Sequence, residues 1–178
     1  ERTGLKVADR TATRMKNVAK KAHQAALAGS YQQLPSLCSL LQQRSPGTVA
    51  EVEKNEDGTF KRLFVMLGRA AHACAQSPLK FICVDSGHLK GEWKGVMLLA
   101  TCKDANNTLV HVATVICDKE DSGNYKWLYG RMKKNAEMET VLNSSKSTIC
   151  TDQHASHGPV LSQFAKNCRR RFCLVHLI

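Results

Sequence analysis

The chain has 178 residues, of which 43% are hydrophobic, and its 26 lysines and arginines outnumber its 15 acidic residues to give a net charge of +11. The hydrophobic content excludes an intrinsically disordered chain and is sufficient for one domain with a core. The positive charge favours a polyanionic partner, nucleic acid first and an anionic membrane second. A basic domain without such a partner fits the charge equally well.

Several protein classes are not indicated by the sequence. It contains no run of 18 apolar residues that would predict a membrane-spanning helix. Charged residues occur throughout residues 1–28, which lack the apolar stretch of a signal peptide, and the first residue is not methionine, as in a fragment. The eight cysteines show no disulfide-framework spacing and mostly lie in apolar runs. This pattern favours buried, reduced thiols and an intracellular protein.

The amino-terminal part is predicted to be helical and then to form a hairpin. Helical spacing of apolar residues predicts a helix over residues 11–28 and another over about 31–43. Seven basic residues stand against two acidic ones in residues 1–25, so the first helix is either an arm that faces DNA or a solvated helix face. Alternating patterns around an Asn-Glu-Asp-Gly turn predict two strands, followed by a short helix: 48–54, 59–67 and 69–76.

The second part of the chain is predicted to contain the core. Three apolar runs with short connections predict an antiparallel meander: 81–84, 95–102 and 109–117. Further elements follow in the order helix, strand, helix, strand: 124–135 (extended by 137–141), 147–151, 159–168 and 172–175. The order β-β-β-α-β-α-β predicts an α/β fold with a mixed sheet. Residues 78–178 then form the core and residues 1–77 a helical and hairpin extension.

Two of the short apolar runs end on an acid, Asp85 in "FICVD" and Asp152 in "STICTD". If these two strands are parallel neighbours, both acids emerge at the same end of the sheet. Two carboxylates about 4 Å apart repel by about 4 kcal/mol at an effective dielectric constant near 20, unless a divalent cation lies between them or one is protonated. Oxygen ligands suit Mg²⁺ or Mn²⁺, and two such ions can clamp the oxygens of a phosphoryl transfer. The alternative is that each Asp only caps a turn.

Four sequence strings together resemble one known family. They are "FKRLFVMLG", "VDSGHLKGEWKGVMLLATCKDANN", "ICTDQHASH" and "RRFCLVHLI". They resemble the catalytic core of Mutator-like element (MULE) transposases over about residues 30–178. The resemblance implies a ribonuclease-H-like fold and an Asp-Asp-Glu triad that holds Mg²⁺ or Mn²⁺ and cuts and joins DNA. It implies Asp85 as the first acid and Asp152 as the second, with DNA as partner, the nucleus as location and a homo-oligomer on transposon ends.

The third acid is where this sequence departs from the family. The family's Glu follows a Cys-x-x-His motif, here Cys173 and His176, and the chain ends two residues after that His. The nearby alternatives are Asp118, Glu120 and Asp121, for which a solvated turn is the favoured interpretation. We therefore expect an incomplete catalytic core, which is an enzyme only if a downstream acid completes it. The alternative is a non-catalytic, domesticated DNA-binding or regulatory protein, or an inactive fragment.

Basic side chains close to the predicted site are candidate contacts for DNA phosphates. They are His88, Lys90, Lys94, Arg169, Arg170 and Arg171. A hairpin turn or a solvated charge run explains these residues as well. Cys173 and His176 have the spacing of zinc ligands, but a closed site requires two more, and the family's zinc-binding modules are absent from this sequence. Zinc is therefore not expected.

Overall fold

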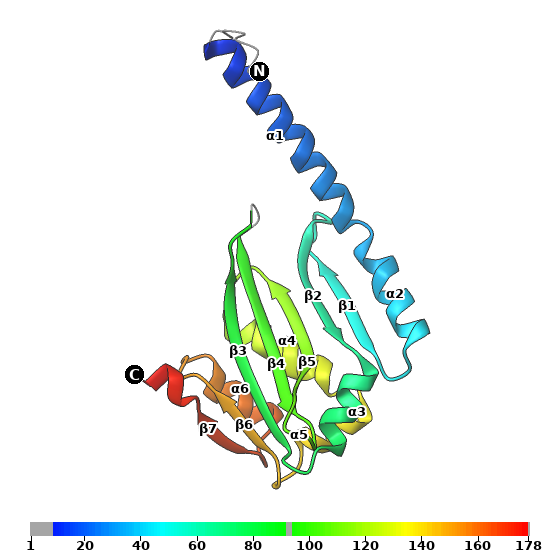
Figure 1. Ribbon diagram of the computed structural model, residues 1–178, viewed down its shortest axis with the longest axis vertical. Coiled ribbons are helices and arrows are strands. Elements are labelled where there is room, and N and C mark those ends of the chain that lie inside the picture. The colour runs from blue at the N-terminus through cyan, green and yellow to red at the C-terminus, as the bar shows by residue number, and fades with distance from the viewer. Residues whose placement is uncertain (1–8, 92–93, 178) are drawn as a thin grey trace. The chain divides into compact units, whose positions relative to one another are not determined.

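The computed structural model describes residues 9–91 and 94–177, and the chain divides into two compact units, Glu1–Pro35 and Ser36–Ile178 (Figure 1). Helix α1 (Asp9–Tyr31) belongs to the first unit. The remaining elements are α2 (Leu34–Arg44), β1 (Val49–Lys54), β2 (Phe60–Met66), α3 (Gly68–Gln76), β3 (Phe81–Leu89), β4 (Gly95–Lys103), β5 (Leu109–Cys117), α4 (Ser122–Met132), α5 (Ala136–Leu142), β6 (Thr148–Thr151), α6 (His157–Phe164), β7 (Arg169–Phe172) and the 3₁₀ helix η1 (Leu174–Leu177).

Helix α1 carries both charged and apolar side chains on its exposed surface. Its basic residues, including Arg14 and Lys20, are exposed, and so are Met15 and Val18, which are 64% and 62% accessible. Exposed cations are common to a DNA-facing arm and to a solvated helix face, so both interpretations of this helix stand. Within the described residues, no helix combines the length and apolar character that crossing a membrane requires.

One seven-stranded sheet organises the second unit, in the order β1-β2-β5-β4-β3-β6-β7. In this spatial order, each of the strands β1, β2, β5, β4 and β3 is antiparallel to the next, whereas β6 runs parallel to β3 and β7 runs parallel to β6. The predicted meander, here β3, β4 and β5, is thus confirmed, and β6 lies parallel to β3, which is the condition for the two acids to emerge at the same end. This mixed α/β arrangement is consistent with a ribonuclease-H-like fold.

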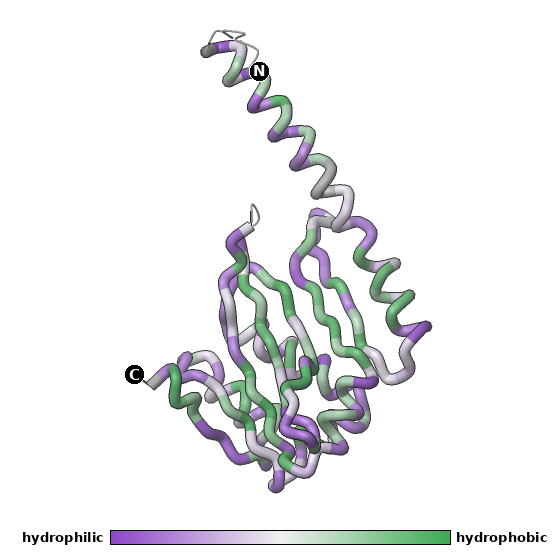
Figure 2. The backbone as a smooth tube through the Cα atoms, viewed as in Figure 1, coloured by the Kyte–Doolittle hydropathy of each residue, from purple (hydrophilic) through white to green (hydrophobic). Residues whose placement is uncertain are grey.

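Helices α4 and α6 lie on one face of the sheet, behind the strands in Figure 1; α3 and α4 contact β5, and α5 packs on α3. Strand β4 shows why: its alternate residues Val96, Leu98, Ala100 and Cys102 are buried, while the intervening residues are half-buried. Period-2 alternation places the first set on the helical side and the second on the opposite side. The hydrophobic segments in Figure 2 follow these central strands. The core is therefore built between one face of the sheet and the helices.

Strand β3 is longer than the sequence predicted, because the prediction ended it at Val84. It continues to Leu89 through regular pairing with β4, in which Asp85 lies opposite Leu99 and Leu89 opposite Gly95. Backbone hydrogen bonding to a strongly β-forming neighbour overrides the low strand propensity of the Asp-Ser-Gly segment. Asp85 therefore lies within β3 and not at its tip.

The last strand is also displaced from its predicted position at residues 172–175. Strand β7 comprises the arginine run Arg169–Phe172, and the apolar residues after it form η1. The backbone of β7 pairs in parallel with β6 from Arg169 opposite Thr148 to Phe172 opposite Thr151. Hydrogen bonds from Arg169 N to Ser147 O and from Cys173 N to Thr151 O extend this pairing at both ends. Charged side chains are usual on an edge strand, so their presence did not argue against a strand here.

Candidate functional site

The parallel ladder between β3 and β6 aligns the two predicted acids. Ile82 pairs with Ile149 and Cys83 with Cys150, and the ladder ends there. Asp85 and Asp152 each follow two residues after that last pair, Asp85 still within β3 and Asp152 directly after β6. Asp85 is exposed and the side chain of Asp152 is 22% exposed. Both predicted acids thus lie just beyond the same end of the parallel ladder.

Each of these carboxylates accepts a hydrogen bond from a nearby backbone amide. The Asp85 Oδ1 atom accepts from Ser86 N at 2.8 Å, and the Asp152 Oδ1 atom accepts from His154 N at 3.0 Å. The turn-capping interpretation fits the Asp152 contact, which lies in a loop, and not the Asp85 contact, which lies within β3. One backbone amide also leaves most of each side chain free to bind, because a carboxylate has about four acceptor positions.

His157 lies behind Asp152 and is fully buried. Its Nδ1 atom is 3.6 Å from Asp152 Oδ1 and has no hydrogen-bond partner among the described residues. Burial lowers the pKa of His157 to about 4, and the nearby Asp152 carboxylate opposes that shift only in part. The imidazole is thus neutral at neutral pH, and its contact with Asp152 is not an ion pair. The ring packs against Tyr125 with centroids 3.7 Å apart.

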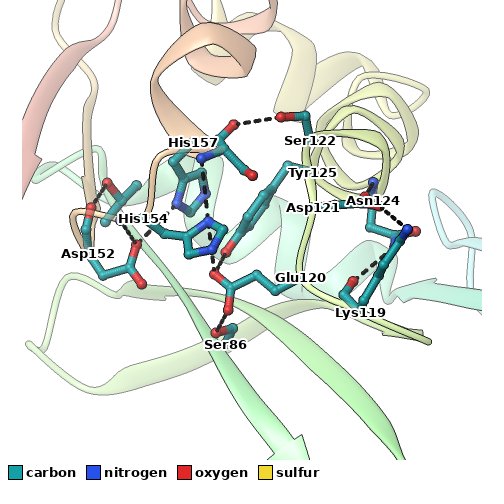
Figure 3. A network of polar contacts seen from close by, with 12 residues as sticks. Ser86, Lys119, Glu120, Asp121, Ser122, Asn124, Tyr125, Asp152, His154 and His157 are labelled. Carbon is teal, nitrogen blue, oxygen red and sulfur yellow. Dashed lines mark hydrogen bonds and ion pairs between the residues drawn. The ribbon is translucent and has the colours of Figure 1, made fainter.

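Glu120 lies between Ser86 on β3 and the two histidines His154 and His157, as Figure 3 shows. Its Oε2 atom accepts a hydrogen bond from Ser86 Oγ and its Oε1 atom one from Tyr125 Oη, both at 2.6 Å. Oε1 is also 3.7 Å from His154 Nδ1, and the side chain is only 15% exposed. Burial, followed by the hydrogen bond to Glu120, raises the pKa of Tyr125, so this phenol remains a donor. The solvated-turn interpretation of this segment is therefore wrong for Glu120.

The other two acids of that segment have structural roles. Asp121 caps α4 by accepting a hydrogen bond from Asn124 N at 2.8 Å, and Asp118 accepts one from Asn124 Nδ2 at 3.3 Å. No local pattern singles out Glu120 among these acids, since its partner Ser86 lies 34 residues earlier and His154 lies 34 residues later. Only the assembled sheet brings the three residues together.

The oxygen donors at this end of the sheet fit part of a divalent metal site. Carboxylates are the donors that Mg²⁺ and Mn²⁺ prefer, and Mg²⁺ is commonly held by one or two carboxylates together with water and substrate phosphate oxygens. Asp85 and Asp152 match that mode of binding. Within residues 9–91 and 94–177 there is no group of three or more His, Cys, Asp or Glu side chains arranged to hold a metal ion. The described side chains thus supply two donors and not a closed cage.

A cavity of about 460 Å³ opens next to Glu120, between the β3–β4 hairpin and the segment after β5. Three of the predicted DNA-contacting residues, His88, Lys90 and Lys94, line it. Lys119, which the sequence did not single out, lines it as well, together with Asp118. We call this cavity the lysine groove. Its lining thus brings three lysines, Lys90, Lys94 and Lys119, together with the acids Asp118 and Glu120.

The three predicted arginines lie elsewhere, on β7, and are not among the residues that line the lysine groove. Arg169 and Arg171 are exposed, while Arg170 is half-buried. The Arg170 guanidinium lies 4.7 Å from the centroid of the Phe172 ring, and its Nη2 atom is 3.5 Å from Thr151 Oγ1. Arg170 therefore packs beside the strand that leads to Asp152, whereas its two neighbours face solvent.

All eight cysteines carry free thiols. Cys83 is half-buried, and burial, followed by the neighbouring Cys150, raises its pKa to about 12. Cys173 lies directly after β7, and His176 N donates a hydrogen bond to Cys173 O at 3.2 Å, so the Cys-x-x-His segment forms one 3₁₀ turn. Burial also raises the pKa of Cys150, so the thiols of Cys83 on β3 and Cys150 on β6 remain protonated at neutral pH.

Comparison with known families identifies one match. Residues 81–178, more than half of the chain, match the MULE transposase domain. The matched stretch begins with β3 and includes Asp85, Glu120, Asp152 and the lysine groove. The resemblance that the sequence strings indicated is thereby confirmed for residues 81–178, whereas the string "FKRLFVMLG" lies before the matched stretch. No curated protein matches the chain.

Proposed function

Because this chain belongs to the MULE transposase domain family, we propose that its sheet is the ribonuclease-H-like core of a Mutator-like DNA transposase. The substrate is then the phosphodiester backbone of DNA. The observation that carries this proposal is the alignment of Asp85 with Asp152, which the parallel ladder between β3 and β6 produces. In sheets with parallel strands, ligands bind beyond the carboxyl ends of the strands, and both acids follow the carboxyl end of this parallel ladder.

Asp85 and Asp152 are the residues that would hold divalent metal ions, Mg²⁺ or Mn²⁺. When bound, such ions polarise the scissile phosphate and activate the attacking oxygen of water or of a 3′-hydroxyl group. The amides of Ser86 and His154 orient the two carboxylates through the hydrogen bonds described above. His157 is neutral and fully buried, so it closes the back of the Asp152 loop to water without adding charge.

The lysine groove supplies the contacts that position DNA. Lys90, Lys94 and Lys119 line a cavity that borders Glu120, and the chain as a whole carries a net charge of +11. Lysines that neutralise phosphates release counterions, so binding should weaken steeply as salt rises. Arg169 and Arg171 are exposed on the edge strand β7 and can contact other phosphates of the same DNA molecule. These contacts carry no base specificity.

A second function has one observation in its favour. Because the described residues form no group of three metal-ligating side chains, a non-catalytic protein that retains DNA binding also fits the structure. Such a protein binds DNA equally well with and without divalent metal, and Asp85→Ala leaves its affinity unchanged.

One experiment separates the two functions. DNA with a nick or a free end is incubated with the protein and Mn²⁺, and cleavage and strand joining are measured alongside DNA binding. The transposase core predicts Mn²⁺-dependent cleavage that Asp85→Ala abolishes. The binding protein predicts salt-dependent affinity and no cleavage. Absence of DNA affinity even at low salt would contradict both.

A further inference from the structure

Ser86 and His154 have the same relationship to the two aligned acids. Each residue donates its backbone N–H to one of them, Ser86 to Asp85 at 2.8 Å and His154 to Asp152 at 3.0 Å. Ser86 Oγ also donates a hydrogen bond of 2.6 Å to Oε2 of a third acid, Glu120, whereas His154 Nδ1 lies 3.7 Å from Oε1, beyond hydrogen-bond distance, and accepts a hydrogen bond from Ser156 N at 3.4 Å (Figure 3). A single carboxylate thus lies next to the two residues whose amides bind the aligned acids.

We propose that Glu120 is a positioning residue that sets the placement of Asp85 relative to Asp152. The proposal rests on the proposed function only in treating those two acids as the functional pair. Glu120 contacts neither of them directly; it accepts a hydrogen bond from Ser86 on β3 and lies beside His154 in the loop between β6 and α6. Tyr125 on α4 provides its third contact, a hydrogen bond of 2.6 Å to Oε1.

The environment of Glu120 makes these contacts strong. Hydrogen bonds from hydroxyl groups to an ionised carboxylate are short, about 2.5–2.7 Å, and stronger than bonds between neutral groups. The side chain is 15% exposed, so water competes little for its oxygens. A partly buried carboxylate without the Ser86 or Tyr125 hydroxyl would remain poorly solvated. Movement of β3 away from α4, which carries Tyr125, is therefore disfavoured.

The hydroxyl groups that bind Glu120 make it possible to tell a positioning role of this side chain from a role of its negative charge. Both hydroxyl partners of Glu120 are neutral, and hydroxyl groups accept hydrogen bonds as well as donate them. A glutamine at this position therefore keeps both contacts after the hydroxyl groups rotate. An alanine keeps neither. If Glu120 served as a metal ligand or as a base, glutamine would be as harmful as alanine.

The backbone amides of Ser86 and His154 report the placement of the two acids directly. We would measure amide hydrogen exchange at these two positions by NMR in the full chain, for the wild type, Glu120→Ala and Glu120→Gln. Removal of the charge-assisted hydrogen bonds should accelerate exchange at both amides by about tenfold or more in Glu120→Ala. Glu120→Gln should stay within about threefold of the wild type. Glu56→Ala, a change in the exposed turn between β1 and β2, is the matched control and should leave both amides unchanged.

Two further variants keep the test decisive if Glu120→Ala does not fold. Ser86→Ala should accelerate exchange at residue 86 and spare residue 154, whereas His154→Ala should do the reverse. The proposal is overturned if Glu120→Ala leaves either amide unchanged, if Glu120→Gln is as disruptive as Glu120→Ala, or if each single-partner variant affects both amides equally.

Mn²⁺-dependent DNA cleavage is assayed in parallel. Absence of cleavage by the wild type would count against the proposed function and leave the exchange result valid, while cleavage with unchanged exchange would refute only the positioning role.

Discussion

Cys83 pairs with Cys150 across the parallel strands β3 and β6, and this pair closes the ladder that sets the register of the two acids. The register is held from the core side, because the preceding pair, Ile82 and Ile149, is buried, at 0% and 1% exposure. A slip of one residue would turn these apolar side chains out of the core. Packing of two isoleucines therefore decides that Asp85 and Asp152 lie at equivalent positions on their strands.

Acid should destabilise the protein through His157. Burial lowers its pKa from 6.5 to about 4, so between these values the unfolded chain binds a proton that the folded chain does not. The stability that the neutral imidazole contributes is complete above pH 6.5 and is lost as the pH falls toward 4. We expect His157 to account for a loss of roughly 2–3 kcal/mol in the free energy of unfolding between about pH 7 and pH 4.5.

Urea unfolding at both pH values measures this loss. His157→Gln should show a smaller decrease on acidification than the wild type, whereas His88→Gln, at an exposed position, should show the wild-type decrease. An identical decrease in the wild type and in His157→Gln would show that another group controls the acid sensitivity.

Binding of DNA should depend on the lysine groove. The logarithm of the DNA-binding constant falls as the logarithm of the salt concentration rises. Replacement of Lys90, Lys94 and Lys119 by alanine should make this dependence shallower, by about 0.9 in slope for each phosphate that the variant no longer neutralises. Fluorescence anisotropy with labelled duplex DNA at several salt concentrations measures that slope. Lys146→Ala is the matched control, because Lys146 is exposed and precedes β6, away from the groove. Equal slopes for the triple variant and the control would place the DNA elsewhere.

The start of β4 tolerates no side chain beyond glycine at residue 95. A Cβ atom there would lie 2.6 Å from the backbone oxygen of Cys117, whereas a Cβ atom at Gly87 on the neighbouring strand would meet nothing within 4 Å. Gly95→Ala should therefore destabilise the protein by about 1–3 kcal/mol through forced separation of β4 and β5. Gly87→Ala should change the free energy of unfolding by less than about 1 kcal/mol. Similar unfolding midpoints in urea for the two variants would contradict this account of the close approach.

The sequence was informative wherever a periodic pattern directly reflects burial. Strand β4 alternates between buried and half-buried residues along its whole length, and the meander and its parallel neighbour follow from such runs. Asp85 and Asp152 were recognisable because each follows an apolar run. The extension of β3 to Leu89 was not, because pairing with β4 and not the propensity of its own residues holds it in the sheet.

Features that depend on distant contacts could not be predicted. Strand β7 consists of a charged segment that becomes a strand by bonding to β6, so no hydrophobic pattern marks it. Glu120 stands in a run of charged residues that is typical of a solvated loop, and its burial depends on Ser86 and His154 from two other parts of the chain. Lys119 enters the lysine groove for the same reason. A local sequence pattern predicts single helices and strands, whereas these sites form where several helices, strands and loops come together.

The most direct test of the central claim is a titration of Mn²⁺ binding followed by electron paramagnetic resonance of the free ion. If Asp85 and Asp152 share a divalent metal site, Asp85→Asn and Asp152→Asn should each weaken binding by at least about tenfold. Asp104→Asn is the matched control, because Asp104 caps the turn after β4 through the amides of Asn106 and Thr108, and asparagine preserves such turns. We predict wild-type affinity for Asp104→Asn and weakened affinity for the other two variants. Equal Mn²⁺ affinity in all four proteins would contradict the assignment of these acids.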